Sequence, residues 1–245
     1  MKAALVTGAS SGIGAAIAVR LAQDGFRVFA AGRDKARTLA VAAGSPAIRA
    51  WTGDLADSAA CRRLVADCIR ELGRLDVLVN NAGIWLPSRA EDTTDEDWQR
   101  TLAVNLSSPF YLAREALPHL RASRGAIINI ASDWGLHGGP NAVAYCASKG
   151  GLVLLTKALA VDHAAEGIRI NAVCPGDVAT PMLFRDAAAR GLDGGVALRE
   201  SASMIRSGRV TTPEEVAGLV AWLASGDAAQ VNGTTILMDG GNAAG

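Results

Sequence analysis

The sequence has no excess of either charge and few cysteines. Lysine and arginine together number 24, as do aspartate and glutamate, and no basic block stands out. This balance argues against nucleic acid or an anionic membrane as the partner. The cysteines lack the spacing of a zinc site, so we expect reduced core thiols and no metal. They are Cys61, Cys68, Cys146 and Cys174.

Long apolar runs are missing as well. No stretch approaches the roughly 20 apolar residues that a membrane-spanning helix needs. The opening residues run directly into a strand-like segment rather than into a secretory signal. We therefore expect a cytoplasmic protein. Half of the residues are hydrophobic although aromatic residues are few, which is enough for a sizeable core of aliphatic side chains.

Short apolar runs alternate with longer helical patterns along most of the chain. Runs that are apolar on both faces and separated by helices predict a parallel sheet covered on both sides. The fold class is therefore α/β, a doubly wound parallel sheet of about seven strands in a single domain over residues 1–245. Strands are expected at 3–7, 27–31, 47–51, 76–80, 126–131, 168–173 and 235–239.

The helices are expected in the stretches between these runs. They lie near 13–24, 58–72, 95–120, 143–165 and 213–224. The segment 182–212 differs from the rest, because it is long, interrupted by glycine and poorly periodic. A long connection in a compact domain is more often a lid or a binding loop than filler. We expect a substrate lid there.

A glycine turn follows the first expected strand. The residues "TGASSGIG", 7–14, lead from that strand straight into a helical pattern. Such a unit aims backbone N–H groups and a helix N-terminus at an anion, commonly a pyrophosphate. The glycines at 8, 12 and 14 do not have the GxGxxG spacing of the commoner dinucleotide fingerprint. A tight turn with close helix packing is the alternative interpretation.

Tyr145 and Lys149 are four residues apart at the start of an expected helix, so they lie on one face. An ammonium placed there would stabilise the phenolate and lower the pKa of the tyrosine. A solvated helix face is the alternative for this pair taken alone. A more acidic tyrosine would serve as a general acid and base near neutral pH.

The ordered set of motifs resembles the short-chain dehydrogenase/reductase family, including members similar to 3-oxoacyl-(acyl carrier protein) reductase. The glycine turn is followed by "GDL" at 53–55, "NNAG" at 80–83, "VNL" at 104–106, Ser132, "YCASK" at 145–149, "RINAVCPG" at 169–176 and "VNGTTILMDGG" at 231–241. The resemblance covers nearly the whole chain. It implies a Rossmann-like domain that moves a hydride between a nicotinamide and a carbonyl/alcohol pair.

The resemblance also implies the roles of four residues. Tyr145 would be the acid/base, and Lys149 would depress its pKa and hydrogen-bond the nicotinamide ribose. Ser132 would polarise the substrate oxygen beside Tyr145. Asn105 is similar to the family asparagine that holds a water molecule and links Lys149 to a proton relay.

A larger set would bind the dinucleotide. By resemblance it comprises Gly8, Ser10, Ser11, Gly12, Ile13, Gly14, Arg33, Asp54, Leu55, Asn81, Ala82, Gly83, Tyr145, Lys149, Pro175, Gly176, Val178 and Thr180. The end of the second strand decides between the two nicotinamide cofactors. Gly32 stands where relatives that prefer NAD carry an aspartate, and the Arg33 guanidinium could bind a 2′-phosphate. NADP(H) is favoured, and NAD(H) stays possible.

The substrate pocket is expected to be largely apolar. It would be lined by Trp85, Trp134, His137, Met182 and Phe184, which follow the "NNAG" motif, follow Ser132 or begin the lid. This lining predicts a small ketone or alcohol substrate and favours apolar ketones over sugars. His137 could bond a second substrate oxygen.

Three alternative functions and one oligomeric state follow from the same residues. A 3-oxoacyl-(acyl carrier protein) reductase would need a basic docking patch for its acidic partner, for which Arg121, Arg124 and Arg169 are candidates. An NAD-dependent alcohol dehydrogenase and a non-catalytic dinucleotide-binding protein are the others. The helices near 95–120 and 143–165 carry Ala- and Leu-rich faces, and the resemblance to relatives that pair these helices into dimers and tetramers implies a homotetramer.

Overall fold

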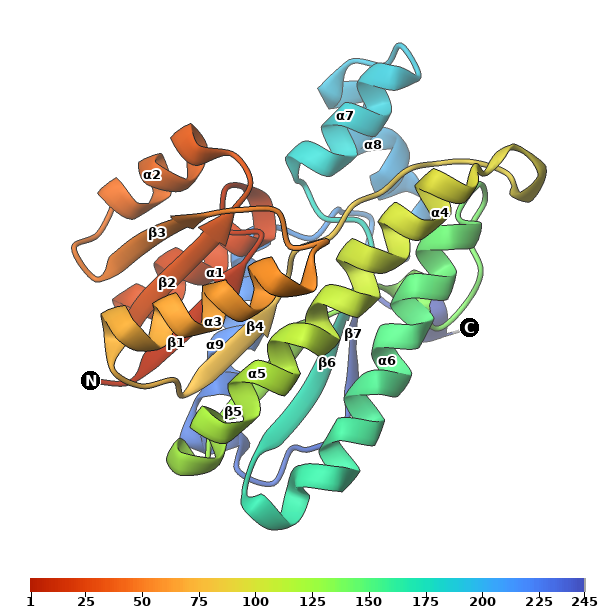
Figure 1. Ribbon diagram of the computed structural model, residues 1–245. Coiled ribbons are helices and arrows are strands. Elements are labelled where there is room, and N and C mark those ends of the chain that lie inside the picture. The colour runs from red at the N-terminus through yellow and green to blue at the C-terminus, as the bar shows by residue number, and fades with distance from the viewer. Residues whose placement is uncertain (245) are drawn as a thin grey trace.

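A seven-stranded parallel sheet runs through the chain, of which the computed structural model describes residues 1–244 (Figure 1). The strands lie in the order β3-β2-β1-β4-β5-β6-β7. Their bounds are β1 Ala3–Thr7, β2 Arg27–Gly32, β3 Ile48–Thr52, β4 Val77–Asn80, β5 Ala126–Ile130, β6 Arg169–Pro175 and β7 Thr235–Met238. The predicted α/β fold class is thereby confirmed, and each strand lies within two residues of its predicted bounds.

Helices cover both faces of the sheet. They are α1 Gly12–Gln23, α2 Lys35–Ala43, α3 Ser58–Leu72, α4 Asp95–Leu102, α5 Ser108–Ser123, α6 Val143–His163, α7 Pro181–Ala189, α8 Gly194–Met204 and α9 Pro213–Ala224. Helices α1 and α9 pack on one face, and α3, α5 and α6 pack on the other (Figure 1). Figure 1 also shows α7 and α8 standing beyond the carboxyl ends of the strands.

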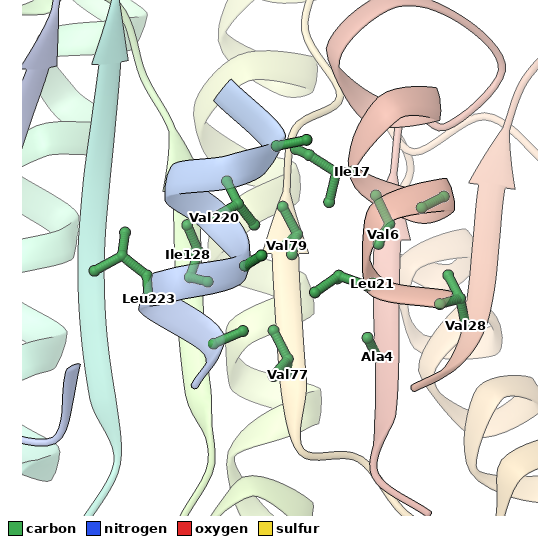
Figure 2. Close-up of a cluster of buried hydrophobic side chains, with 14 of the residues drawn as sticks. Ala4, Val6, Ile17, Leu21, Val28, Val77, Val79, Ile128, Val220 and Leu223 are labelled. Carbon is green, nitrogen blue, oxygen red and sulfur yellow. The ribbon is translucent and has the colours of Figure 1, made fainter. Parts of the chain in front are cut away.

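The core explains why the strands are apolar on both faces. Along β1, Ala4 and Val6 pack beneath α1 and α9, with Ile17 and Val220 above them (Figure 2). The residue between them, Leu5, belongs to the opposite cluster under α3 and α5. Because successive strand side chains point to opposite faces, a strand buried on both sides needs a continuous apolar run.

Three helical regions differ from the sequence expectation. Helix α2 was not predicted, and the segment 182–212 holds α7 and α8 rather than only irregular chain. The expected helix 95–120 is interrupted by a π-helical turn, Ala103–Ser107, between α4 and α5. A π turn inserts one extra residue into the helix and is frequent at functional sites.

Helix α6, with the turn after it, is the one segment of residues 1–244 that is long and apolar enough to cross a membrane, judged by length and composition alone. Its mean hydropathy over 18 residues is 1.2. The helix packs on the sheet, where Leu152, Val153 and Ala160 are buried, and its side chains include the buried Lys149. A core helix passes the same test, so this finding is weak evidence for a membrane.

Candidate active site

A cleft of about 630 Å³ opens at the carboxyl ends of the central strands. Its walls come from the turn after β1, the residues that follow β2, β4, β5 and β6, and the start of α7. The strand order reverses between β1 and β4, so this edge is the switch point at which open α/β sheets bind ligands.

The glycine turn is shaped by close backbone packing. Gly8 and Gly12 have φ angles of +64° and +55°, a region that side chains with a Cβ disfavour. A Cβ on Gly14 would lie 2.3 Å from the carbonyl oxygen of Gly8. The Asn81 amide nitrogen donates to the carbonyl oxygen of Thr7 at 2.9 Å, which ties this turn to the end of β4.

The turn suits a pyrophosphate. Ser11, the residue before α1, places no side-chain oxygen on the first N–H groups of the 12-residue helix. Those donors have no partner within the helix, so a bound anion can accept from them. The sequence-predicted positions for the dinucleotide all line the cleft except Gly14, which lies behind the turn and keeps it tight.

The far end of the cleft is basic. Arg33 and Arg37 both line it, and Arg37 was not predicted. The Arg37 guanidinium lies 2.7 Å from the carboxylate of Asp34, the N-cap of α2. In contrast, the Arg33 side chain is exposed, and no ion pair or hydrogen bond occupies it anywhere in residues 1–244. Arg33 is therefore the guanidinium that remains available to a ligand there.

Asp54 carries an ion pair that the sequence did not indicate. Its Oδ2 accepts a 2.7 Å hydrogen bond from Arg100 of α4, and its Oδ1 accepts from the Ala56 N–H at 3.1 Å. An ionised carboxylate has about four acceptor positions, so it can still accept a bond from a ligand. The ion pair fixes where that carboxylate stands at the rim of the cleft.

Ser132, Tyr145 and Lys149 meet at the other end of the cleft. Ser132 follows β5, while Tyr145 and Lys149 lie one turn apart on α6. Lys149 is only 4% exposed, and its ammonium donates to the carbonyl oxygen of Ile130 at 2.8 Å. It lies 5.6 Å from the centre of the Tyr145 ring.

The pKa values of this pair differ from the sequence expectation. Burial raises the pKa of Tyr145 to about 12 and lowers the pKa of Lys149 to about 8. In the chain by itself, the predicted depression of the tyrosine pKa is thus wrong. The physical reason is that loss of water disfavours both charged forms. The ammonium is also engaged with the Ile130 carbonyl.

Asn105 lies behind the cleft rather than in it. It is fully buried in the π-helical turn, where its Oδ1 accepts from the Ile84 N–H at 2.8 Å. Its Nδ2 donates to the Ile84 carbonyl at 3.0 Å and to Ser148 Oγ at 3.1 Å. The side chain therefore holds the segment after β4 against α6, the helix that carries Tyr145 and Lys149.

Asp133 is a functional candidate that the sequence reasoning missed. The Ser132 hydroxyl donates to Asp133 Oδ1 at 2.9 Å, and the Trp134 N–H donates to the same oxygen at 2.8 Å. The residue lines the cleft and is 8% exposed. Burial raises the pKa of this carboxyl group. Its position directly after Ser132 is the signal that could have identified it.

Three aromatic rings enclose the space next to Ser132. The ring centres of Trp85 and Tyr145 lie 5.2 Å apart, those of Trp85 and Trp134 5.4 Å, and those of Trp134 and Tyr145 6.3 Å. All three pairs meet edge to face, a favoured arrangement for aromatic side chains. Trp85 Nε1 also donates to Asp186 of α7 at 3.1 Å, which joins the lid segment to the opposite wall.

Two predicted pocket residues lie outside the lining of the cleft. His137 is exposed, and its Nδ1 lies 3.1 Å from the carbonyl oxygen of Gly138. Phe184 is turned toward Gly194 at the start of α8, where a Cβ would lie 3.3 Å from its ring. Of the five pocket predictions, Trp85, Trp134 and Met182 line the cleft.

Comparisons with known proteins agree with this arrangement. A family model described as enoyl-(acyl carrier protein) reductase matches residues 8–243. A meso-2,3-butanediol dehydrogenase of Serratia marcescens is 39% identical over 98% of this chain and 94% of its own. A D-beta-hydroxybutyrate dehydrogenase of Rhizobium meliloti is 39% identical over 98% of both chains. The ligand-free aldohexose dehydrogenase of Thermoplasma acidophilum is 32% identical, with a TM-score of 0.92 over 100% of this chain and 94% of its own.

Proposed function

Because the chain belongs to the short-chain dehydrogenase/reductase family, and is therefore an NAD(P)-dependent oxidoreductase of CH–OH groups, we propose that it transfers a hydride between NADP(H) and a ketone or secondary alcohol. The observation that carries the proposal is the meeting of Ser132, Tyr145 and Lys149 in the cleft that the glycine turn opens. The test is oxidation of NADPH and of NADH with a panel of ketones.

Tyr145 is the acid/base in this proposal. When bound, the dinucleotide would supply or accept the hydride. During reduction the Tyr145 hydroxyl gives its proton to the substrate oxygen, and during oxidation the phenolate takes it back. Ser132 Oγ turns its one proton from Asp133 Oδ1 to the substrate oxygen and holds that oxygen in place. The rings of Trp85 and Trp134 lie against Tyr145 and limit the access of water to this proton transfer.

Lys149 and Asn105 act on Tyr145 rather than on the substrate. A lysine with a pKa of about 8 is mostly an ammonium at pH 7, so it favours the phenolate when the proton leaves. Asn105 is a positioning residue, since its amide joins Ile84, after β4, to Ser148 on the helix that carries Tyr145.

The basic end of the cleft supports NADP(H) as the preferred cofactor. Arg33 has a guanidinium free to meet a 2′-phosphate. A side chain at residue 32 would place its Cβ 2.4 Å from Thr38 Oγ1. The carboxylate that relatives preferring NAD carry at this position therefore has no room unless Thr38 moves. NAD(H) is the alternative cofactor.

Replacement of the free arginine tests this preference. Arg33→Ser is expected to lower kcat/KM with NADPH about tenfold or more, because a hydrogen bond to a charged group contributes about 1.5–3 kcal/mol. Efficiency with NADH should stay within about threefold. The matched control is Arg37→Ser, whose smaller effect is expected because Asp34 already holds that guanidinium. A wild-type enzyme that prefers NADH by tenfold would contradict the assignment.

The charges at the expected docking patch give little support to an acyl carrier protein as a partner. Arg121 is paired with Glu166 at 2.9 Å. Arg169 is half-buried and donates inward to the carbonyl oxygen of Leu223 at 2.6 Å. The expected basic patch thus lacks two of its three free charges. The non-catalytic alternative is excluded by the family, whose relatives are named as dehydrogenases over nearly the full chain.

A homotetramer is the assembly that we propose, in a cytoplasmic protein. The outer faces of α5 and α6 expose apolar side chains, with Phe110 41%, Leu154 67% and Val161 79% exposed. Pairing these helices between copies would cover them, and a second symmetric contact would give four subunits. Light scattering at micromolar concentration should give the mass of a tetramer, and a monomer would contradict the proposal.

A further inference from the structure

We propose that Asp133 determines substrate specificity by accepting a hydrogen bond from a hydroxyl group on the carbon next to the reacting carbon. The inference rests on the proposed function and names its substrate class: vicinal diols and α-hydroxy ketones. It replaces the expectation, drawn from the apolar lining alone, that plain ketones are preferred. That expectation did not include a carboxylate in the substrate half of the cleft.

The first observation behind this inference is the position of the Asp133 carboxylate. Asp133 Oδ1 lies 2.9 Å from Ser132 Oγ, the atom proposed to hold the reacting oxygen. A substrate oxygen bound to Ser132 therefore lies about two hydrogen bonds from Asp133, each roughly 2.8 Å long. The second oxygen of a vicinal pair is about one hydrogen-bond length from the first. It can thus reach the carboxylate while the first oxygen stays on Ser132.

The second observation is that the Asp133 carboxylate can accept further hydrogen bonds. Oδ1 accepts from the Ser132 hydroxyl and the Trp134 N–H. Oδ2 has no hydrogen bond within residues 1–244, and its closest ion-pair contact, His137 Nε2, is 3.7 Å away. That separation exceeds hydrogen-bond distance. When Ser132 turns its proton to a bound ketone oxygen, Oδ1 also loses one of its two donors. A nearly buried carboxylate oxygen without a donor is costly, so a substrate hydroxyl satisfies an oxygen that a plain ketone leaves unpaired.

The rest of the pocket fits the same class of substrate. Trp85 and Trp134 offer apolar ring surface for the C–H face of a short carbon chain. A polar group on one side and ring faces on the other distinguish a diol from a hydrocarbon of the same size. Sites built to bond a substrate hydroxyl discriminate strongly against analogues that lack it.

The experiment compares two ketones with the same carbon skeleton, 3-hydroxybutan-2-one and butan-2-one. For each enzyme, the measured quantity is the ratio of kcat/KM for the hydroxy ketone to kcat/KM for the plain ketone. The Asp133→Ala substitution should lower this ratio at least tenfold relative to wild type. The loss should come from the hydroxy ketone, because both substrates use Ser132 in the same way. The change in ratio cancels the difference in intrinsic carbonyl reactivity.

Two further variants keep the test decisive. Asp133→Asn keeps the size and an acceptor but removes the charge, so an intermediate ratio is expected even if Asp133→Ala folds poorly. Asp177→Asn removes another carboxylate that lines the cleft, and the ratio should stay within about twofold of wild type. Equal losses on both ketones in the Asp133 variants would overturn the inference, because Asp133 would then only position Ser132.

The proposed function can fail separately. If the wild-type enzyme reduces cyclohexanone but not 3-hydroxybutan-2-one, the substrate class is wrong and the oxidoreductase assignment stands. If it reduces no ketone with either cofactor, and oxidises none of the corresponding alcohols, the proposed function is wrong and the inference falls with it.

Discussion

Replacing Tyr145 by phenylalanine should lower kcat/KM by at least two orders of magnitude. The substitution removes one hydroxyl group and keeps a ring that can hold the edge-to-face contacts with Trp85 and Trp134. The loss is therefore assigned to proton transfer, for which general acid/base catalysis contributes about 10²–10⁴-fold. The measurement is steady-state reduction of a ketone with NADPH.

Dinucleotide binding is the control for Tyr145→Phe. Titration of the protein with NADPH, followed by cofactor fluorescence, should give a Kd within about threefold of wild type, because the phosphate-binding turn is untouched. An activity within a few-fold of wild type would remove Tyr145 from its assigned role. Loss of NADPH binding would show that the substitution acts on cofactor binding instead.

Lys149→Met should strongly reduce activity and stabilise the cofactor-free protein. Activity should fall by at least two orders of magnitude, because no ammonium remains to favour the phenolate. The decrease of the Lys149 pKa from 10.5 to about 8 reflects a desolvation cost of roughly 3 kcal/mol for the charged form at pH 7. Allowing about 1 kcal/mol for the lost bond to the Ile130 carbonyl, the free energy of unfolding should rise by about 2 kcal/mol.

The pH dependence of stability checks the same variant. Between pH 8 and 10.5 the unfolded chain binds a proton at Lys149 that the folded chain has released. Lys149 therefore contributes a rise of the free energy of unfolding with pH across this window. The raised pKa values of Cys61, Cys68 and Cys174 act in the opposite direction above about pH 9, and that of Tyr145 does so above about pH 10, in both proteins. Because Lys149→Met lacks only the lysine contribution, its gain in stability over the wild type should shrink between pH 7 and pH 9.5, and urea unfolding of both proteins measures this difference. A gain that is the same at both pH values would show that Lys149 is not the responsible group.

The strands, and the placement of Tyr145 and Lys149 one turn apart on a helix, could be predicted from the sequence because local patterns determine them. A strand buried on both faces has a continuous apolar run, as in the first four residues of β1. Helix α2 has no such pattern, since Thr38 is its only buried residue. Helix α8 likewise buries only Ala197 and Ser201, so the periodicity that marks a helix is weak there.

The other side chains of the site could not be predicted, because the conformation of the turns after the strands decides where they point. The 3₁₀ turn Asp133–Gly135 brings the Asp133 carboxylate onto Ser132, whereas sequence proximity alone left it without a role. The same turn directs His137 outward, so the expected pocket histidine is exposed. Phe184 was misplaced for a similar reason, because its direction depends on the contact of α7 with Gly194 in α8.

The π-helical turn at Ala103–Ser107 also determines where the chain can change length during evolution. Because the π turn holds the extra residue, deleting one residue there would restore an ordinary α-helical turn and leave α4 and α5 in nearly the same phase. The deletion would instead remove the position from which the Asn105 amide joins Ile84 to Ser148. Insertions and deletions should therefore be excluded from this turn among relatives that keep the asparagine. Surface connections such as the one between α7 and α8 can vary in length freely.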